Sequence, residues 1–394
     1  MNSAPRIFVT GLGMISPAGA GTAAYWMDLC AATPHFEELE PLYAGMKPGA
    51  LGGRVPWSAR TEAMSAPVFE RGARPRMASV FAVYAAVEAV RDAGMEAADP
   101  LLRTAVVCVG TSDGHADGLE AVGAGLADEA ASFSSATIAA TVAGAVGSLG
   151  PAFVVNGTCA SANVALAAAL DALRSGLAEV AVVGGCDAYS QKNIIGFSSL
   201  KAIGPQPCRP FAQDRRYVTP SEGAGVLVIQ TERSLGADQV PYAEVLASAV
   251  NNDARHPTAP DPAGVEACHR RALHEAGLSA SKIDVIYAHG TGSRINDAIE
   301  EQIFLDNYPR ATVTAVKGTV GHLMGGAGAA GAVAACLTLR HRLVPPTAVE
   351  ADAVNPGLEL VTGAPRAVPD VRYVQNNALG FGGNNALSIF RQIS

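Results

Sequence analysis

The sequence is poor in charged and aromatic side chains, and it contains no long apolar run. Only 16% of its 394 residues are charged and 6% are aromatic. Gly, Ser and Thr interrupt the richest apolar stretches, so none is expected to span a membrane. The formal net charge is −8 with no basic face in view, which argues against a nucleic-acid partner. No basic segment and apolar core of a signal peptide precede the first expected strand, so we expect a cytoplasmic protein.

Cysteine is also scarce, and its spacing excludes two common roles. The chain has seven cysteines, an odd number, and no two of them form a C-x-x-C pair. This speaks against a disulfide framework and against a structural zinc site. His289 and His322 have no carboxylate or third histidine at ligand spacing, so no metal is expected there either. Most of the cysteines are therefore expected to be packing residues.

What the sequence has in abundance is glycine and small apolar residues. It contains 42 glycines and 49% hydrophobic residues, which suits an α/β core with many tight turns. Apolar runs of strand length alternate with segments of helical periodicity, and this indicates a mainly parallel sheet in each half. We expect strands at 7–10, 104–109, 153–155, 180–184, 226–230, 242–251, 283–288, 312–316, 371–378 and 386–390, and helices at 77–93, 163–175, 264–276 and 326–340.

The chain is longer than one hydrophobic core usually supports. The charged, turn-rich segment 231–241 is the best candidate linker, which divides the chain into halves 1–236 and 237–394. A strand, a sharp loop and an Ala-rich helix occur around Cys159 and again around His322. If this is an internal duplication, the two helices are expected to pack back to back, with both loops opening on one cavity.

Cys159 lies where the apolar run 153–155 ends and an Ala/Leu-rich helix begins. A turn from strand to helix pushes a side chain out of the sheet, and the first N–H groups of a helix favour a thiolate. A buried cysteine is more often an inert small hydrophobic residue. Placement alone therefore leaves both interpretations open.

The C-terminal third supplies polar groups in Gly-rich turns. His289 and Lys317 each follow a buried strand, and His322 lies in the same loop as Lys317. A buried lysine needs a countercharge, for which Asp297, Glu300 and Glu301 are available. The turn 380–383 offers backbone N–H groups to an oxyanion, or is merely a β-turn. A strand-end histidine and a helix cap are the structural alternatives for the two imidazoles.

Taken in order, these motifs resemble the β-ketoacyl-(acyl carrier protein) synthases, the decarboxylating condensing enzymes of the thiolase superfamily. The resemblance covers essentially the whole chain and implies a thiolase-like, duplicated, five-layered αβαβα fold. One such motif is weak evidence, whereas the full set in order favours the catalytic interpretation. The motifs lie at 9–17, 156–162, 183–187, 209–211, 222–225, 289–300, 317–322 and 377–383.

The resemblance implies a role for each catalytic side chain. Cys159 accepts an acyl group from a carrier-protein thioester. His289 and His322 bind the thioester carbonyl of a malonyl extender, promote loss of CO₂ and stabilise the enolate, for which neutral imidazoles are needed. Lys317 is implied as an organising charge beside His322, paired with Glu300.

Further residues are implied in substrate binding. The backbone N–H groups of Cys159 and Phe381 form an oxyanion hole, and the Phe381 ring acts as a gate. Thr291 and Ser293 match positions that hold the phosphopantetheine arm, and the turn glycines Gly382 and Gly383 line the substrate site. No metal or organic cofactor is implied, because the substrates arrive on the phosphopantetheine of an acyl carrier protein.

Partners follow from the same resemblance. Carrier proteins are acidic, so an acidic synthase needs a basic docking spot, and Arg71, Arg74 and Arg76 form the best cluster in the sequence. Three surface arginines are more often simply solvated. Members of the family are two-fold dimers, so we expect a homodimer or a heterodimer with a ketosynthase-like subunit.

Departures from the family pattern point to a specialised pathway. Leu379 replaces an aromatic residue, small Ser112 lies near a position that is often a branched apolar gate, and 114–141 is short. We expect an acyltransferase of the 3-oxoacyl-(acyl-carrier-protein) synthase type, in fatty-acid-like, polyene or type II polyketide biosynthesis.

Four alternatives remain at this point. A chain-length-setting partner subunit usually lacks the nucleophilic cysteine, and a coenzyme A-dependent thiolase usually has a second, C-terminal cysteine. An initiating synthase has Asn in place of the second histidine. A scaffold protein predicts that the polar loops share no cavity.

Overall fold

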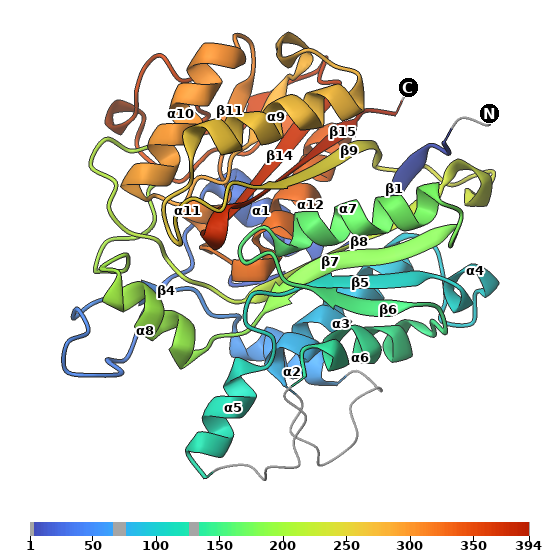
Figure 1. Cartoon of the computed structure of the whole chain (residues 1–394), viewed down its shortest axis with the longest axis horizontal. Coiled ribbons are helices and arrows are strands. Elements are labelled where there is room, and N and C mark those ends of the chain that lie inside the picture. The colour runs from blue at the N-terminus through green and yellow to red at the C-terminus, as the bar shows by residue number, and fades with distance from the viewer. Residues whose placement is uncertain (1–3, 66–75, 126–133, 394) are drawn as a thin grey trace.

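The computed structural model describes residues 4–65, 76–125 and 134–393. Their strands and helices alternate along the chain (Figure 1). The first half contains β1 (Ile7–Ser16), β2 (Gly19–Ala20), α1 (Thr22–Ala31), β3 (Glu37–Glu38), β4 (Leu51–Gly52), α2 (Trp57–Met64), α3 (Met77–Asp92), α4 (Pro100–Arg103), β5 (Val106–Gly110), α5 (Ala116–Gly123), α6 (Ala136–Val146), β6 (Ala152–Val155), α7 (Ser161–Arg174), β7 (Val180–Asp187), α8 (Gln191–Ser199) and β8 (Gly223–Thr231). The second half contains β9 (Ala243–Asn252), α9 (Pro262–Ala276), β10 (Val285–Tyr287), α10 (Arg294–Asn307), β11 (Thr312–Thr314), α11 (Lys317–Val320), α12 (Ala327–His341), β12 (Leu343–Val344), β13 (Arg366–Ala367), β14 (Tyr373–Gly380) and β15 (Asn384–Arg391).

The strand order shows that the two halves repeat one topology. The first half is ordered β6-β5-β7-β8-β1, and the second is ordered β11-β10-β14-β15-β9. Numbered within its own half, each set reads 3-2-4-5-1. The sets meet where β1 pairs with β9, with Phe8 opposite Glu244 and Val9 opposite Ala243. The internal duplication that the sequence suggested is therefore present in the fold.

Each set of five strands is mainly parallel, as predicted, with one strand reversed. Strands β5, β6 and β7 are mutually parallel, and so are β10, β11 and β14. Strand β8 runs antiparallel to β7 and to β1, and β15 runs antiparallel to β14 and to β9. A turn of only three residues, Phe381–Gly383, joins β14 to β15 and forces that reversal.

Alternating residues along the strands build five layers. In β5, Val106 and Cys108 pack in the cluster that contains α7 and α12, whereas Val107 and Val109 pack against α3 and α6. The second set of strands packs on the same central helices with one face and on α9 and α10 with the other. Figure 1 shows this stack, with α9 and α10 above and α3 and α6 below. The predicted five-layered αβαβα architecture is confirmed.

The two central helices lie back to back, as predicted. A Cβ atom on Gly328 of α12 would come within 2.7 Å of the Asn163 side-chain oxygen on α7, so only glycine fits there. The Asn376 amide of β14 donates to that same oxygen of Asn163 at 3.2 Å. Small residues and paired amides therefore hold the seam between the halves.

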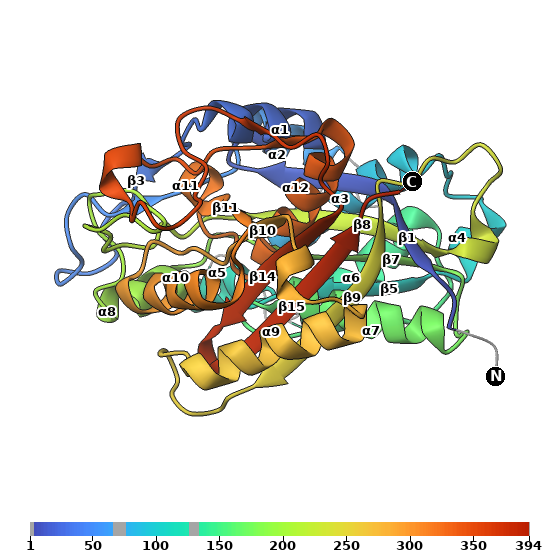
Figure 2. The ribbon, with the colours of Figure 1, turned by 90° about the horizontal axis from the view of Figure 1, so that it is seen from above.

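Two connections bear on the site and on the domain boundary, the turn between β14 and β15 and the segment that joins the two halves. Strands β14 and β15 meet at the turn Phe381–Gly383, at their ends away from both chain termini (Figures 1 and 2). The segment 231–241 contains the last residue of β8, a short 3₁₀ turn at Glu232–Ser234 and most of the loop that leads to β9. That 1–236 and 237–394 fold as separate domains stays a prediction. In the described ranges, no helix has the length and apolar character needed to cross a bilayer.

Candidate active site

Cys159 lies in a strained turn between β6 and α7. Thr158, just before it, has φ of 53°, a left-handed conformation that non-glycine residues rarely adopt. The Thr158 hydroxyl donates to the Gly157 carbonyl at 2.7 Å and to the Phe381 carbonyl at 3.0 Å. The turn is therefore held from both halves of the chain, and it presents a thiol that is only 6% exposed.

The turn between β14 and β15 fits against this elbow without a gap. A Cβ atom on Gly380 would overlap the Thr158 hydroxyl and lie 2.7 Å from the Gly157 carbonyl oxygen, so the position requires glycine. The backbone N–H groups of Phe381 and Cys159 lie close enough to the Cys159 sulfur to lower its pKa. Two donors from opposite halves thus converge on one atom, which is the arrangement expected of an oxyanion site.

Burial raises the pKa of the Cys159 thiol to about 11. The Lys317 ammonium and the two backbone N–H groups lower that pKa, but they do not offset the loss of solvent. The sequence indicated that the start of the helix favours a thiolate. In the free protein, desolvation outweighs that effect.

Helix α10 fixes the loop that carries His289. The Glu300 carboxylate accepts the backbone N–H groups of His289 and Gly290, both at 2.8 Å. Asp297 does the same for Thr291 at 2.9 Å. The Asn377 amide donates to Glu300 at 3.2 Å. Burial raises the pKa of Glu300, while these donors oppose the shift.

Lys317 contacts His289 directly and interacts with Glu300 and His322 through charge. Its ammonium donates to the His289 carbonyl and lies 3.3 Å from His289 Nδ1. Among the described residues it forms no direct ion pair with Glu300 and no hydrogen bond with His322, although Glu300 raises the pKa of Lys317 and Lys317 lowers the pKa of His322. The Glu300 oxygens are already occupied by backbone and amide N–H groups. Lys317 and Glu300 therefore both bind the backbone of His289: Lys317 donates to its carbonyl, and Glu300 accepts its N–H.

The two imidazoles lie next to each other. Their ring centres are 5.4 Å apart and the ring planes are nearly perpendicular. The backbone N–H of Met324 donates to His322 Nδ1 at 3.1 Å. Burial, with a further contribution from Lys317, holds the pKa values of His289 and His322 well below the ordinary value. Both rings are therefore neutral at physiological pH.

The hydrogen bonds also fix where each neutral ring carries its proton. His322 Nδ1 accepts from Met324, and His289 Nδ1 faces an ammonium that has only hydrogens to offer. A nitrogen that accepts carries no hydrogen, so the hydrogen of each ring is on Nε2. Each imidazole thus has an N–H free to donate.

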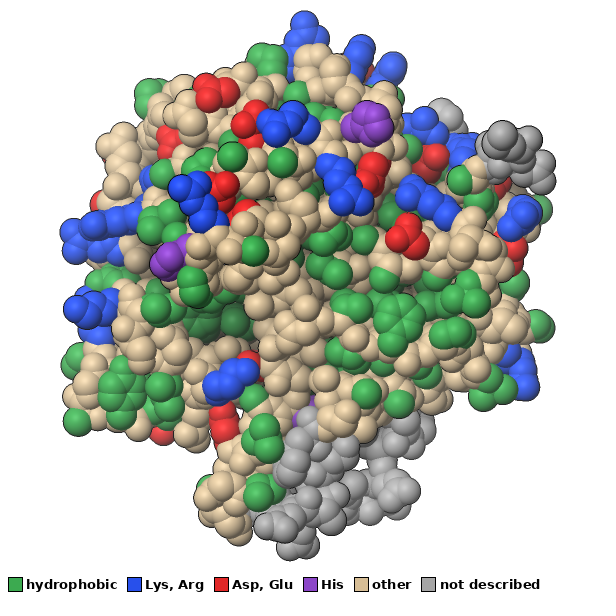
Figure 3. All heavy atoms as spheres, in the orientation of Figure 1, with side chains coloured by type: hydrophobic (Ala, Val, Ile, Leu, Met, Phe, Trp, Pro, Cys, Tyr) green, Lys and Arg blue, Asp and Glu red, His purple; other side chains and the backbone are tan. Residues whose placement is uncertain are grey.

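One cavity of about 290 Å³ joins the sulfur and the two imidazoles. Cys159, His289 and His322 all line it, together with an apolar wall that includes Phe197 and Leu379. Figure 3 shows a hollow lined by hydrophobic side chains in the left half of the face in view. The shared cavity contradicts the scaffold alternative, which predicts that these loops open in different places.

The expected substrate-binding residues line the same cavity. They include Thr291, Ser293 and the turn 381–383. The Phe381 ring is half-buried, with its centre 5.8 Å from that of Phe197 on α8. The Phe381 ring, predicted to act as a gate, thus lies beside the Phe197 ring.

Three cations that the sequence did not single out lie on the rim of this cavity. Lys201, Arg216 and Arg294 are exposed, and within the described ranges no carboxylate pairs with any of them. Arg216 contacts the Tyr217 hydroxyl. The three are far apart in sequence, so no cluster marked them.

The predicted docking cluster is only partly described. Arg71 and Arg74 lie outside the described residues. Arg76 is half-buried, and its guanidinium lies against Gly118 of α5. The structure therefore places cations at the cavity mouth, while the interpretation of 71–76 stays a prediction.

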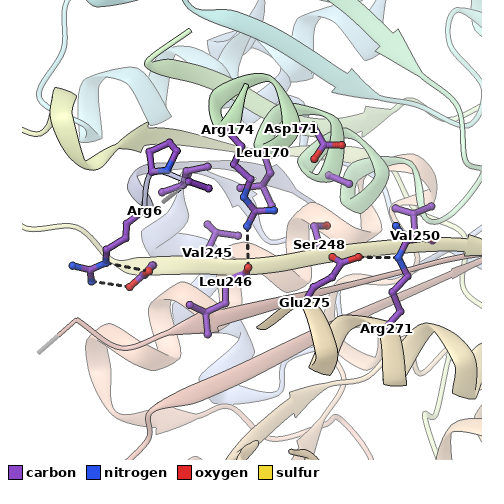
Figure 4. A pocket seen from close by; sticks show the side chains of 15 residues that line it. Arg6, Leu170, Asp171, Arg174, Val245, Leu246, Ser248, Val250, Arg271 and Glu275 are labelled. Atoms are coloured by element: carbon purple, nitrogen blue, oxygen red, sulfur yellow. Dashed lines mark hydrogen bonds and ion pairs between the residues drawn. The ribbon is translucent and has the colours of Figure 1, made fainter. Parts of the chain in front are cut away.

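A second, larger cavity shares no residue with the site. It measures about 590 Å³ and lies between α7, β9 and α9 (Figure 4). Arg6 pairs with Glu244, Arg174 donates to the Leu246 carbonyl, and Arg271 pairs with Glu275. Each of these three arginines thus has a partner in the wall of the cavity. In the described part of the chain, no cluster of three His, Cys, Asp or Glu side chains is placed to hold a metal ion.

Comparisons with known proteins agree with this geometry. The family described as "Beta-ketoacyl synthase, N-terminal domain" matches residues 4–234, and "Beta-ketoacyl synthase, C-terminal domain" matches 242–349. Nodulation protein E of Rhizobium meliloti (strain 1021) is 31% identical, covering 98% of this chain and 99% of the relative. The 3-oxoacyl-[acyl-carrier-protein] synthase 2 of that strain is 30% identical, with the same coverage. The solved structure described as "The ishigamide ketosynthase/chain length factor" is 32% identical and matches with a TM-score of 0.91 over 100% of both chains. The chain belongs to the β-ketoacyl synthase family of condensing enzymes.

Proposed function

We propose that this protein is a β-ketoacyl-(acyl carrier protein) synthase. It joins a Cys159-bound acyl chain to a malonyl unit by decarboxylative Claisen condensation. The observation that carries the proposal is the shared cavity, in which a thiol with two converging N–H donors faces two neutral imidazoles. The proposal needs no cofactor, because the malonyl carboxylate itself supplies the carbanion when CO₂ leaves.

The first step is acyl transfer to sulfur. The Cys159 sulfur attacks the thioester carbonyl of an acyl carrier, and the N–H groups of Cys159 and Phe381 receive the developing oxyanion. The bond to the pantetheine sulfur then breaks. The proton lost from the thiol ends on that departing sulfur, so the step needs no permanent base. Lys317 supports it by favouring the thiolate.

The second step forms the new carbon–carbon bond. His289 and His322 each present an Nε2–H, and two donors aimed at one malonyl thioester oxygen stabilise the enolate formed as CO₂ departs. The enolate carbon attacks the acyl carbonyl on Cys159, and the sulfur leaves. Charged imidazoles would protonate the enolate, so the lowered histidine pKa values suit this role.

We further propose an acyl carrier protein as the partner that delivers both substrates. The name of the 30% identical synthase specifies such carriers. Carriers are acidic and hold the thioester on a phosphate-bearing arm, and Lys201, Arg216 and Arg294 put unpaired positive charge at the cavity mouth. Thr291 and Ser293 line the cavity that this arm would enter.

The pathway proposal is a specialised one, of the polyene or type II polyketide kind. The 32% identical solved structure is described as a ketosynthase/chain length factor. This chain has the cysteine that length-setting subunits usually lack, so we propose that it is the condensing subunit. A heterodimer and a homodimer both stay predictions. Light scattering of the chain alone and after coexpression with a candidate second subunit distinguishes them.

The decisive experiment is reconstitution with defined carriers. Malonyl carrier protein and a panel of acyl carriers are supplied, and CO₂ release and product mass are followed. We expect Cys159→Ala to abolish condensation, whereas Cys159→Gln, an acyl-thioester mimic, keeps malonyl decarboxylation. Cys30→Ala, at a half-buried cysteine on α1, is the matched control and should elongate normally. Undiminished elongation by Cys159→Ala would falsify the mechanism.

A further inference from the structure

Asp187, at the end of β7, is fully buried and is surrounded by donors. Its carboxylate accepts the Thr111 hydroxyl at 2.6 Å and the backbone N–H groups of Ser112 at 2.8 Å and Asp113 at 3.0 Å. A fourth bond comes from the other half of the chain, where Gly325 N–H donates at 2.6 Å. No acid–base step proposed above uses this carboxylate.

The four bonds join two loops that are far apart in the sequence. Thr111 to Asp113 follow β5 in the first half, and Gly325 follows His322 in the second. A Cβ atom on Gly325 would lie 2.6 Å from the Ser112 nitrogen, so the two loops pack with backbone against backbone. Asp187 is the charge that satisfies N–H groups from both.

The segment held by Asp187 leads directly to a catalytic imidazole. Met324 precedes Gly325 and has φ of 53°, a strained conformation that needs support from its surroundings. The N–H of this same Met324 is the donor to His322 Nδ1. If Gly325 were released, Met324 could relax toward ordinary backbone angles, and its N–H would swing away from the imidazole.

We propose that Asp187 is a positioning residue that sets the tautomer of His322. It anchors Gly325, which keeps Met324 N–H on Nδ1 and so keeps the hydrogen of the ring on Nε2, where the malonyl oxygen binds. The assignment rests on the proposed function for its catalytic meaning. The tautomer itself can be measured without any substrate.

A carboxylate is specifically required at this position. Thr111 and Asp113 donate to one oxygen, and Ser112 and Gly325 donate to the other. In Asp187→Asn, an NH₂ group replaces one oxygen and faces two donors, so two buried hydrogen bonds are lost in either orientation. Burial raises the pKa of Asp187 to about 6, against the four donors, so the group is ionised near neutral pH.

Two readouts test the proposal on the full-length protein. The first compares malonyl decarboxylation with acylation of Cys159 by an acyl carrier. In Asp187→Asn we expect decarboxylation to fall about 10- to 100-fold. Acylation should fall less than about threefold, because the Asp187 charge raises the pKa of Cys159 and its loss favours the thiolate. Glu244→Gln is the matched control, because Glu244 is a buried carboxylate that binds Arg6 and Arg391 away from the site. Equal losses in both steps would mean that Asp187 merely supports the fold.

The second readout is the ¹⁵N NMR spectrum of histidine-labelled protein, with His322 assigned by its absence in His322→Asn. We expect wild type and Glu244→Gln to show one tautomer with the hydrogen on Nε2, and folded Asp187→Asn to show a mixture. An unchanged tautomer in folded Asp187→Asn overturns the proposal even if activity is lost. If that variant does not fold, Asp187→Glu keeps the charge but displaces both loops, and the same shift toward a mixture is expected. If the wild-type protein shows no condensation at all, but Asp187→Asn still shows the mixture of tautomers, the proposed function alone is rejected.

Discussion

The two halves of this chain share one strand order but differ at every connection that reaches the cavity. After the third strand of each half, the first places Cys159, and the second places Lys317 and His322. After the second strand, the first half has the 111–113 loop held by Asp187, and the second has the His289 loop held by α10. The scaffold repeats, whereas the chemistry does not.

The connection between the fourth and fifth strands differs most. In the first half, residues 188–222 include α8 and contribute Phe197, Lys201 and Arg216 to the cavity. In the second half, Phe381–Gly383 is a tight turn that reaches across to the Cys159 sulfur. A duplicated fold thus becomes asymmetric by lengthening one loop and shortening its equivalent. The comparison predicts that the nucleophile of acyl transfer comes from the first half, whereas the imidazoles that promote decarboxylation come from the second.

The largest expected effect separates the two steps. His322→Ala removes one of two N–H donors to the enolate, and malonyl decarboxylation should fall about 10²- to 10³-fold. Acylation of Cys159, followed by mass spectrometry of the protein, should stay within severalfold of wild type. If acylation falls as far as decarboxylation, the chemistry is not divided between the halves.

The seam between the halves should be intolerant of added volume. A Cβ atom on Gly331 of α12 would overlap the Asn376 side-chain oxygen. We expect Gly331→Ala to destabilise the protein by about 2 kcal/mol, roughly 30-fold in the unfolding equilibrium, because close-packed interiors accept extra atoms poorly. Urea unfolding measures the effect. Gly123→Ala, where no described atom lies within 4 Å of the new atom, is the control and should unfold at or slightly above the wild-type urea concentration. Equal urea midpoints of unfolding for the two variants would show that α12 and β14 pack less closely at Gly331 than the structure indicates.

Lys317, from the second half, should act on the sulfur of the first. Its charge lowers the pKa of Cys159, so Lys317→Met, which keeps much of the volume, should raise that pKa. At pH 8 we expect alkylation of Cys159 by iodoacetamide to slow about tenfold, which corresponds to about one pKa unit. Arg310→Met, at an exposed cation outside the cavity, should not change the rate. An unchanged rate in Lys317→Met would remove the electrostatic coupling between the halves.

The pH profile of the same reaction checks the sign of the burial effect. A thiol with pKa of about 11 is mostly protonated through pH 8 to 10, so its alkylation rate should still rise about tenfold per pH unit there. An ordinary exposed cysteine levels off near pH 9. A plateau at Cys159 below pH 9 would mean that the backbone donors outweigh desolvation.

The smallest effect is expected at the rim, where solvent screens charge. Arg216→Glu should raise KM for malonyl carrier protein about 3- to 10-fold with little change in kcat, and added salt should shrink the difference. Arg216→Glu should turn over a malonyl thioester of free pantetheine at the wild-type rate, because this small substrate has no carrier surface. Arg310→Glu is the matched exposed control. A defect with the small thioester would assign Arg216 to the cavity rather than to docking.

Much of the scaffold was predictable because it depends on local periodicity. The expected strands and helices correspond to β1, β5 to β11, β14 and β15 and to α3, α7, α9 and α12, with ends within three residues except that β1 continues to Ser16. The prediction omitted the short strands β2 to β4, β12 and β13 and the helices α1, α2, α4 to α6, α8, α10 and α11. Helix α10 follows the His289 loop, where Gly and Ser suggested only a turn. Its polar face is explained by the loop that it holds, and this is a tertiary fact.

The sequence by itself determined which residues stand at the strand ends, since Cys159, His289 and His322 each follow an apolar run beside glycine. It also suggested an internal duplication, because a strand, a sharp loop and an Ala-rich helix occur around Cys159 and again around His322. Only the tertiary structure decided that Lys317 contacts His289, that Asp187 joins two loops, and that burial outweighs the helix start at Cys159. The physical reason is that hydrogen-bond partners, desolvation and charge act through space, between segments that the linear order keeps far apart.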